Sequence, residues 1–530
     1  MSEMIFTQKG RLIMLRETLE RGEFAITCEF VPGRGKTGPG VDAAIEFAKA
    51  LSGTGSKIHA VSLTDNPGGN AAITPDALAP EVQKYGLDAL VHFSCRDLNR
   101  NAVESRVMAL ARAGVNNLLV LTGDYPASGF EGNAAGVFDL DSVQTIKYLK
   151  EMNAGLEVPG AKKGTMVRLP QTNFFIGAAV SPFKLKEEEL LPQFFKLEKK
   201  IAAGADFIIT QLGYDMRKFL EVKRYMVSRG LKVPLIGNVY VLSYGAAKTM
   251  HAGLVAGCVV TDELLALLET ESKEPDKGKA KRLERAAKMV AMFKGMGYNG
   301  VHIGGFGLKN EDFLSIIKRA DELAEQWEAF IPEVCFSQKD EFYLFPPPKT
   351  YRPGDVDEDP VKKLPPGHGK LGYEISMAFH RMAFERGSIG CRLLTRYYQM
   401  TVRHPRLAKF SHFNEYMVKM LSFGCRDCGD CALPDMAYCC PQSMCAKQQR
   451  NGPCGDSKCG MCGVYPDERP CAWTVVYSRM KGAGKLEEMR SNYVPPRKMN
   501  LAYTSGWANY FLNKDHAAEI KGKEQNPTKP

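Results

Sequence analysis

The chain has 530 residues, about 3.5 times the rough 150 residues of a typical domain, which excludes a single small module. Hydrophobic residues make up 44% and charged residues 25%, values typical of a globular protein, which exclude a fibrous or wholly disordered chain. The net charge of +10 is modest and scattered. It therefore suits anionic small molecules or acidic protein partners and does not favour a nucleic-acid partner.

Eight short apolar runs alternate with amphipathic stretches between residues 23 and 327, a pattern typical of βα repeats around a parallel sheet. Eight such units in about 300 residues predict an α/β fold, a (βα)8 TIM barrel, with an open doubly wound sheet as the alternative. The expected strands are residues 24–31, 57–64, 89–94, 117–122, 174–180, 206–212, 234–241 and 300–303.

Composition changes after the last of these units. Residues 336–372 are rich in proline and charge, which indicates a linker or an extended wrap. We therefore expect a barrel domain over 1–335, a linker over 336–372, a small cysteine-rich α-helical domain over 373–500, and a polar tail over 501–530.

The chain contains no run of 18 apolar residues and its first eleven residues lack a signal-peptide pattern, so we expect a cytoplasmic protein without a membrane span. Of 15 cysteines, ten lie between Cys425 and Cys471. In a reducing compartment such a cluster indicates metal or iron–sulfur ligation and not disulfides.

Polar residues recur at the carboxyl ends of the predicted strands, where the active sites of (βα)8 barrels lie. Glu29 stands between Cys28 and Phe30 in an apolar strand. Poor solvation should raise the pKa of its carboxyl group and prepare it to donate a proton, although a pairing with a buried cation is the alternative. Asp124 could equally cap the next helix, His92 could be a satisfied core residue, and Gln211 could only satisfy backbone groups.

Five segments together resemble the methylenetetrahydrofolate reductase family over residues 20 to about 330. They are Cys28-Glu29-Phe30 with Pro32 and Arg34, Ser62-Leu63-Thr64, His92-Phe93-Ser94-Cys95, Leu121-Thr122-Gly123-Asp124 and Ile209-Thr210-Gln211. The resemblance implies a flavin-containing barrel that reduces 5,10-methylenetetrahydrofolate to 5-methyltetrahydrofolate.

The resemblance also implies roles for single residues. Glu29 matches the general acid that opens the folate ring, Asp124 a carboxylate beside flavin and pterin, and Gln211 an amide that orients the folate or the reductant. Thr64, His92, Gly123, Ala179 and Lys200 match flavin contacts. The segment Val180-Ser181-Pro182-Phe183 departs from the family pattern, which leaves both FAD and FMN open. The segments Gly237-Asn238-Val239-Tyr240 and Gly304-Gly305-Phe306-Gly307 differ from family forms that are reduced directly by NAD(P)H.

The cysteine-rich region offers ligands for two metal centres. Cys425, Cys428 and Cys431 can turn around one face of a 4Fe-4S cluster, with Cys440, which precedes Pro441, as one candidate fourth ligand. A second site could draw on Cys445, Cys454, Cys459, Cys462 and Cys471, with Cys459 and Cys462 as its tight pair. Zinc is the alternative metal for either site, because four thiolates serve both. The remaining candidate ligand is Cys439.

This region resembles the cysteine-rich domain fused to, or partnered with, such reductases in bacteria. The resemblance implies that electrons reach the flavin through clusters, from ferredoxin or a partner oxidoreductase, instead of or alongside NAD(P)H. We accordingly expect a homo-oligomer or part of a larger redox complex. The alternatives are a folate-dependent methyltransferase with a zinc or corrinoid acceptor, and an electron-transfer adapter; the joint presence of Glu29, Asp124 and Gln211 argues against the adapter.

Overall fold

The computed structural model describes residues 14–353, 361–365, 367 and 371–518. Eight parallel strands close into a barrel in the order β1-β12-β11-β10-β9-β4-β3-β2, which confirms the (βα)8 prediction and all eight expected strands. The strands are β1 (Ala25–Phe30), β2 (Ala60–Leu63), β3 (Asp88–Ser94), β4 (Asn117–Leu121), β9 (Phe175–Val180), β10 (Phe207–Thr210), β11 (Leu235–Tyr240) and β12 (Gly300–Gly304).

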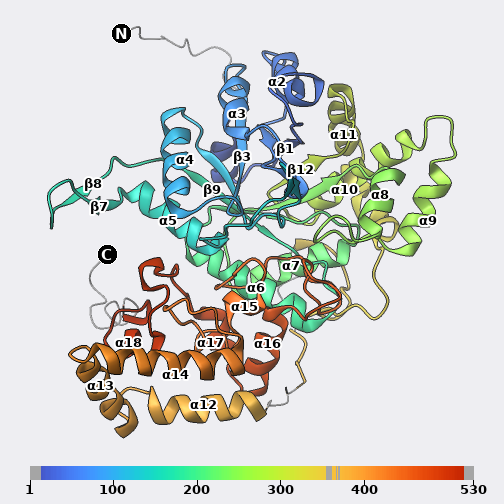
Figure 1. Cartoon of the computed structure of the whole chain (residues 1–530). Helices are drawn as coiled ribbons and strands as arrows, with labels where there is room; N and C mark the ends of the chain where they lie inside the picture. The colour runs from blue at the N-terminus through green and yellow to red at the C-terminus, as the bar shows by residue number, and fades with distance from the viewer. Residues whose placement is uncertain (1–13, 354–360, 366, 368–370, 519–530) are drawn as a thin grey trace.

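Helices surround the barrel, as Figure 1 shows. Their apolar faces pack on the outer sides of the strands and form the large hydrophobic core. The helices are α2 (Pro39–Leu51), α3 (Pro75–Gln83), α4 (Arg100–Arg112), α5 (Ser142–Ala154), α6 (Glu187–Ala202), α7 (Met216–Ser228), α8 (Tyr244–His251), α9 (Asp262–Glu271), α10 (Lys279–Gly295) and α11 (Asn310–Glu322). Two small hairpins extend from loops: β5–β6 (Ser128–Gly129, Gly132–Asn133) from the loop between β4 and α5, and β7–β8 (Glu157–Pro159, Met166–Arg168) from the loop between α5 and β9.

The barrel interior changes from apolar to polar along its axis. Side chains of a strand alternate between its two faces, so Ala25, Thr27 and Glu29 of β1 all face inward. The lower layer is apolar, with Phe175 and Phe207 stacked at 5.0 Å, and α1 (Leu15–Glu20) closes that end. The layers above it carry hydroxyl, imidazole and carboxyl groups, which places the chemistry at the carboxyl ends of the strands.

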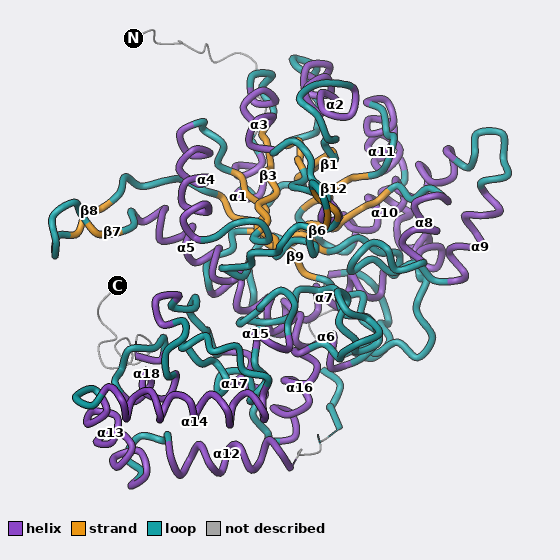
Figure 2. The backbone as a smooth tube through the Cα atoms, viewed as in Figure 1, coloured by secondary structure: helices purple, strands orange, loops and turns teal. Residues whose placement is uncertain are grey.

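A second domain of short helices and long loops lies below the barrel, coloured orange to red in Figure 1. Its α16 and α17 pack against α6 of the barrel. Figure 2 shows that the chain between α14 and α16 is mostly loop. The helices are α12 (Leu371–Ala383), α13 (Ile389–Thr401), α14 (Pro405–Phe423), α15 (Pro441–Met444), α16 (Ala472–Gly482), α17 (Leu486–Ser491) and α18 (Gly506–Phe511).

The segments that join and end these domains are packed. In the predicted linker, Leu344 and Phe345 are buried in the barrel's outer core, so its first part is a wrap. At the other end, Phe511 stacks on Phe384, and His516 donates its backbone N–H to Asp430 Oδ1 over 2.9 Å. The described part of the predicted tail therefore belongs to the cysteine-rich domain.

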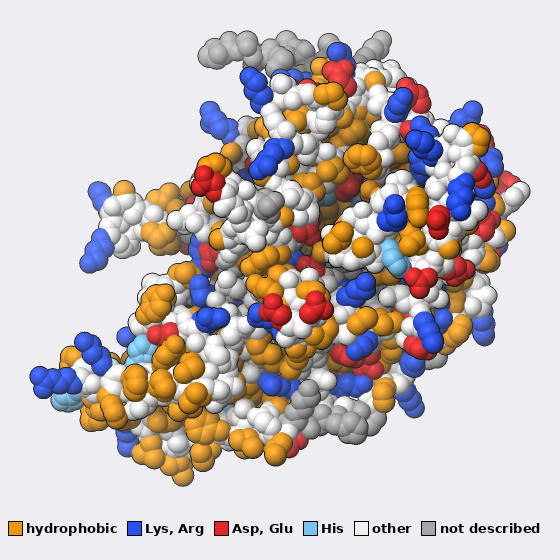
Figure 3. All heavy atoms as spheres, turned by 45° about the vertical axis from the view of Figure 1, so that its right-hand side comes forward, with side chains coloured by type: hydrophobic (Ala, Val, Ile, Leu, Met, Phe, Trp, Pro, Cys, Tyr) orange, Lys and Arg blue, Asp and Glu red, His pale blue; other side chains and the backbone are white. Residues whose placement is uncertain are grey.

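Apolar side chains are also exposed on the second domain. They include Leu371, Ile389 and Leu421 on α12, α13 and α14, and Figure 3 shows hydrophobic side chains gathered over the lower part of the molecule. No helix among the described residues is both long enough and apolar enough to cross a membrane.

Candidate active site and cysteine groups

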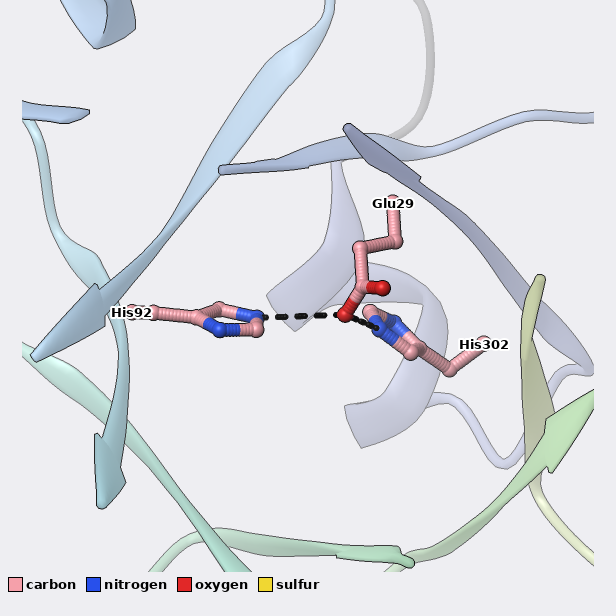
Figure 4. Close-up of side chains that lie close together, drawn as sticks. All are labelled: Glu29, His92 and His302. Carbon is pink, nitrogen blue, oxygen red and sulfur yellow. Dashed lines mark hydrogen bonds and ion pairs between the residues drawn. The ribbon is translucent and has the colours of Figure 1, made fainter. Parts of the chain in front are cut away.

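Glu29 lies inside the barrel between two histidines from other strands (Figure 4). Its Oε2 is 3.1 Å from Nε2 of His302 on β12 and 3.9 Å from Nε2 of His92 on β3. Hydroxyl groups hold both rings: Thr27 Oγ1 is 2.8 Å from His302 Nδ1, and Ser62 Oγ is 2.9 Å from His92 Nε2. The arrangement joins one carboxyl group to a chain of groups that can pass a proton.

The pKa of Glu29 is lowered, so the predicted rise is wrong for the free chain. Burial acts in the predicted direction and is the largest single influence. The hydrogen bond from His302 and the charges of His302 and His92 together outweigh it. The sequence showed the apolar strand around Glu29, but the two histidines come from strands that are distant along the chain.

His92 has a pKa lowered to about 4 because burial disfavours the imidazolium, so it is neutral near pH 7. His302 is a site residue that the sequence analysis missed. It sits in the apolar run Gly300–Gly304 and pairs in register with Thr27. The alternation of β12 puts His302 on the inner face, and this could have revealed it once the strand's register was known. Ligand atoms of Glu29, His92 and His302 lie within 4.8 Å of one another, close enough to hold a cation.

Asp124 is placed at the same mouth but in a separate contact network. Its Oδ2 accepts a hydrogen bond from the Gly68 backbone over 3.0 Å. Burial and then the nearby charge of Asp456 raise its pKa, against the opposing charges of Lys447 and Arg96. Asp456 and Lys447 belong to the cysteine-rich domain, so this domain reaches the barrel mouth.

The predicted flavin contacts lie around the strand ends. Lys200 donates to the Ala179 carbonyl over 2.6 Å, and burial lowers its pKa to about 7. Gly123 has φ +85°, and a Cβ there would lie 2.1 Å from Ser94 Oγ. The hydroxyl of Thr64 is buried and has no hydrogen-bond partner among the described residues. An orphaned hydroxyl at a strand end is available to a ligand.

Gln211 follows β10, which only β9 separates from β4, and lies beside the loop that follows α8. Its Oε1 accepts from the Leu212 backbone over 2.9 Å, and its amide nitrogen lies next to Gly257. The adjacent Cys258, which the sequence analysis did not single out, has a pKa raised to about 12 by burial and then by Asp124 and Glu29. Both carboxylates thus act on the same thiol.

The cysteines separate into two groups. The outer cysteine group, Cys425, Cys428, Cys431 and Cys440, lines one small pocket between α14 and α15. Burial raises the pKa of Cys425 and Cys428, and the thiol of Cys440 adds to both shifts. The structure thus brings Cys440 to the predicted Cys-x2-Cys-x2-Cys run.

Electrostatic interactions join Cys445, Cys454, Cys462 and Cys471 into an inner cysteine group. Burial raises the pKa of Cys454 to about 12, with a further contribution from Asp456. Cys439 packs in the hydrophobic core, and Cys459 is exposed. The pairing of Cys459 with Cys462 in the second site stays a prediction.

Residues 447–457, which include the inner group's Cys454, contact the barrel mouth directly. Lys447 Nζ donates to the Gly123 carbonyl over 2.7 Å, next to Asp124. From the barrel, Thr122 Oγ1 donates to Gln449 Oε1 over 3.3 Å. The inner group therefore lies beside the predicted flavin contacts.

Comparison with known proteins gives matches to both parts. Residues 14–321 match the family model described as methylenetetrahydrofolate reductase, and residues 404–500 match the model described as methylene-tetrahydrofolate reductase C terminal. Methylenetetrahydrofolate reductase 2 of Schizosaccharomyces pombe is 25% identical over 263 residues, covering 46% of this chain and 38% of the relative. Methylenetetrahydrofolate reductase (NADH) 1 of Arabidopsis thaliana is 25% identical over 295 residues, covering 54% of this chain and 47% of the relative.

The chain thus spans less than half of the length of these two curated relatives. Among solved structures, an uncharacterized protein from Clostridium thermocellum that binds two copies of 5-methyl-5,6,7,8-tetrahydrofolic acid aligns with a TM-score of 0.41 and 15% identity, covering 59% of this chain and 98% of that one. The family model covers more than half of the 530 residues. The chain belongs to the methylenetetrahydrofolate reductase family.

Proposed function

We propose that the barrel reduces 5,10-methylenetetrahydrofolate to 5-methyltetrahydrofolate with a bound flavin, FAD or FMN, and that electrons arrive through iron–sulfur clusters on the C-terminal cysteines. Family membership of residues 14–321 supports the reaction class. The observation that carries the proposal is the Glu29 carboxyl at the barrel mouth, 3.1 Å from His302 Nε2. A proton donor at this position is what ring opening of the folate requires.

Different residues donate the proton, position the donor and stabilise the charge that results. Glu29 gives a proton to a folate nitrogen, so that the five-membered ring opens to an iminium. Thr27 and His302 position the carboxyl group, because Thr27 Oγ1 lies 2.8 Å from His302 Nδ1 and His302 Nε2 lies 3.1 Å from Glu29 Oε2. Asp124, which follows β4 at the barrel mouth, stabilises the positive charge of the iminium with its carboxylate.

The barrel mouth fits a flavin. The hydroxyls of Thr64 and Ser181 are buried at strand ends and have no partner among the described residues. Gly123 keeps the end of β4 free of a side chain. When bound, a reduced flavin supplies the hydride that the methylene carbon accepts.

Each cysteine group offers four thiolates, the ligand number of a 4Fe-4S cluster. The Cys-x2-Cys-x2-Cys run together with Cys440 supports a cluster in the outer group. Ferredoxin, a partner oxidoreductase or NAD(P)H is the electron donor, and zinc is the alternative metal for either group.

The first test is Glu29→Gln in the full-length protein, purified without oxygen. We expect flavin absorbance to persist and folate reduction to fall by about 100- to 10,000-fold, the usual contribution of a general acid. The matched control is Glu46→Gln, because Glu46 is an exposed residue on α2. Substantial turnover in Glu29→Gln would remove Glu29 from this role, and a colourless protein that contains only zinc would favour the methyltransferase.

A second test uses His302→Gln and the pH dependence of kcat/KM. His302 lowers the pKa of Glu29, so its loss leaves burial to raise that pKa. Because the acid must be protonated, the fall in kcat/KM with rising pH should move to higher pH in the variant. An unmoved profile would contradict the assignment of His302 as the residue that positions the acid.

A further inference from the structure

Lys196, on barrel helix α6, extends into the loop of the inner cysteine group. Its Nζ donates to Gln449 Oε1 at 2.9 Å, to the Gly452 carbonyl at 3.3 Å and to the Pro453 carbonyl at 3.0 Å. The side chain is 2% exposed. Three acceptors match the three N–H donors of an ammonium group, so the loop is built for a positive charge.

The loop is closely fitted to this lysine. Gly452 has φ +136°, and a Cβ there would lie 2.7 Å from Lys196 Cβ. Lys184 adds a second ammonium on the other side of Cys454, donating to the carbonyls of Gly455 at 2.5 Å and Ser457 at 2.7 Å. Two buried barrel lysines therefore flank one ligand of the inner group.

The two cysteine groups differ in how nearby cations are balanced. Lys184 and Lys196 form no ion pair with any described carboxylate and donate to uncharged oxygens. The outer group also interacts with a buried lysine, Lys419, but Glu415 Oε1 holds its Nζ at 2.8 Å. Asp456, the carboxylate beside Cys454, is paired with Lys447, and Arg450 near the outer group is paired with Asp430. Lys184 and Lys196 therefore remain as the cations beside the inner group that no described carboxylate balances through an ion pair.

A positive environment favours the reduced state of an iron–sulfur cluster, because reduction adds a negative charge. We propose that the ammonium groups of Lys184 and Lys196 raise the reduction potential of a cluster on the inner cysteine group above that of a cluster on the outer group. This rests on the proposed function only in requiring clusters at both groups. Electrons then move from the outer group to the inner group and on to the barrel mouth.

The electron count is simple. Each transfer oxidises the outer cluster by one electron and reduces the inner cluster by one. Two such transfers and two protons convert 5,10-methylenetetrahydrofolate into 5-methyltetrahydrofolate. The co-reactant is a one-electron, low-potential iron–sulfur carrier that reduces the outer group again.

The test is a redox titration of the full-length protein, followed by electron paramagnetic resonance, with iron and zinc analysis. We expect two cluster potentials in the wild type. Lys196→Met should lower the higher one by at least a tenfold change in the oxidised-to-reduced ratio, or 59 mV, and leave the other unchanged. Lys184→Met serves as the second variant if Lys196→Met loses metal. Lys199→Met is the control, because Lys199 lies on the same helix and points toward the Trp473 ring, 5.8 Å away.

Unchanged potentials in both lysine variants with clusters retained would overturn the inference, as would zinc in the inner group. Two separate measurements test the proposed function: the flavin content of the protein and its reduction of folate with an artificial electron donor. If zinc occupies the inner group while that reduction persists, the inference fails and the proposed function stands. If flavin is absent and no folate is reduced, the proposed function fails.

Discussion

The barrel and the cysteine-rich domain are held together in different ways. The barrel closes its own strands and buries large apolar side chains both inside and outside the sheet. Residues 425–471 of the cysteine-rich domain contain one four-residue helix, and they bury Asp430, Lys447 and Arg450. Hydrophobic burial needs no exact partner, whereas buried charges and thiols need specific ones. The barrel should therefore be stable without its ligands, and the cysteine-rich domain should not.

Removal of the metal should produce the largest difference in stability between the two domains. Binding of a structural metal contributes about 10 kcal/mol to folding in small metal domains, so Cys454→Ser or chelation should unfold the cysteine-rich domain and leave the barrel folded. Hydrogen-exchange mass spectrometry resolves the two domains. Cys391→Ser is the control, because Cys391 lies on α13 of the same domain and outside the cysteine run 425–471. Equal loss of protection in both domains would contradict the expected independence of the barrel.

Phe207→Ala should destabilise the barrel and leave the cysteine-rich domain folded. Phe207 is fully buried in the barrel interior, where Gly177 leaves space for its ring. Its truncation should lower the free energy of unfolding of the barrel by about 3–5 kcal/mol. Urea unfolding followed by barrel-peptide exchange measures the loss. Phe130→Ala, at a side chain 91% exposed, should change little.

Raising the pH should weaken only the cysteine-rich domain. Asp430 and Asp435 hold the His516 ring between them, and these contacts raise its pKa to about 9 despite burial. The protonated His516 contributes about 3 kcal/mol to the free energy of unfolding. This contribution is complete below pH 6.5 and is lost as the pH rises through 9. Unfolding of that domain between pH 6 and 10 measures the loss. His516→Gln should flatten the dependence, and an unchanged slope would argue against it.

The smallest effect is expected at the contact between the domains. Tyr477 OH donates to Glu187 Oε1 over 2.6 Å, from α16 to α6. Tyr477→Phe should cost about 1.5–3 kcal/mol in the unfolding of the cysteine-rich domain, the range for a hydrogen bond to a charged acceptor. Tyr503→Phe, at a residue 80% exposed, is the matched control. Equal effects of the two variants would show that the contact adds nothing.

Sequence patterns predicted the barrel more completely than they predicted the candidate active site. Alternating apolar runs located all eight strands, and Glu29 stood out as a carboxyl in such a run. His302 escaped notice because its strand is short and nothing local shows which strand lies beside it. The lowered pKa of Glu29 depends on that neighbour and could not be predicted without it.

The cysteine-rich domain was less predictable for a related reason. Spacing identified Cys425, Cys428 and Cys431 because they lie on one local turn. The inner group draws its members from loops with no hydrophobic period, so spacing favoured Cys459, which the structure exposes. Of the two lysines that flank Cys454, Lys196 comes from α6 of the barrel and Lys184 from the loop before α6, both more than 250 residues away. Contacts between residues so far apart in the sequence cannot be predicted from local residue spacing.

Gly452 has a consequence for engineering. A β-carbon at this position would collide with Cβ of Lys196, so Gly452→Ala should push the loop of the inner cysteine group away from the barrel. Under the proposed function, this one methyl group would disconnect the cysteine-rich domain from the folate site without changing any cysteine or acidic residue.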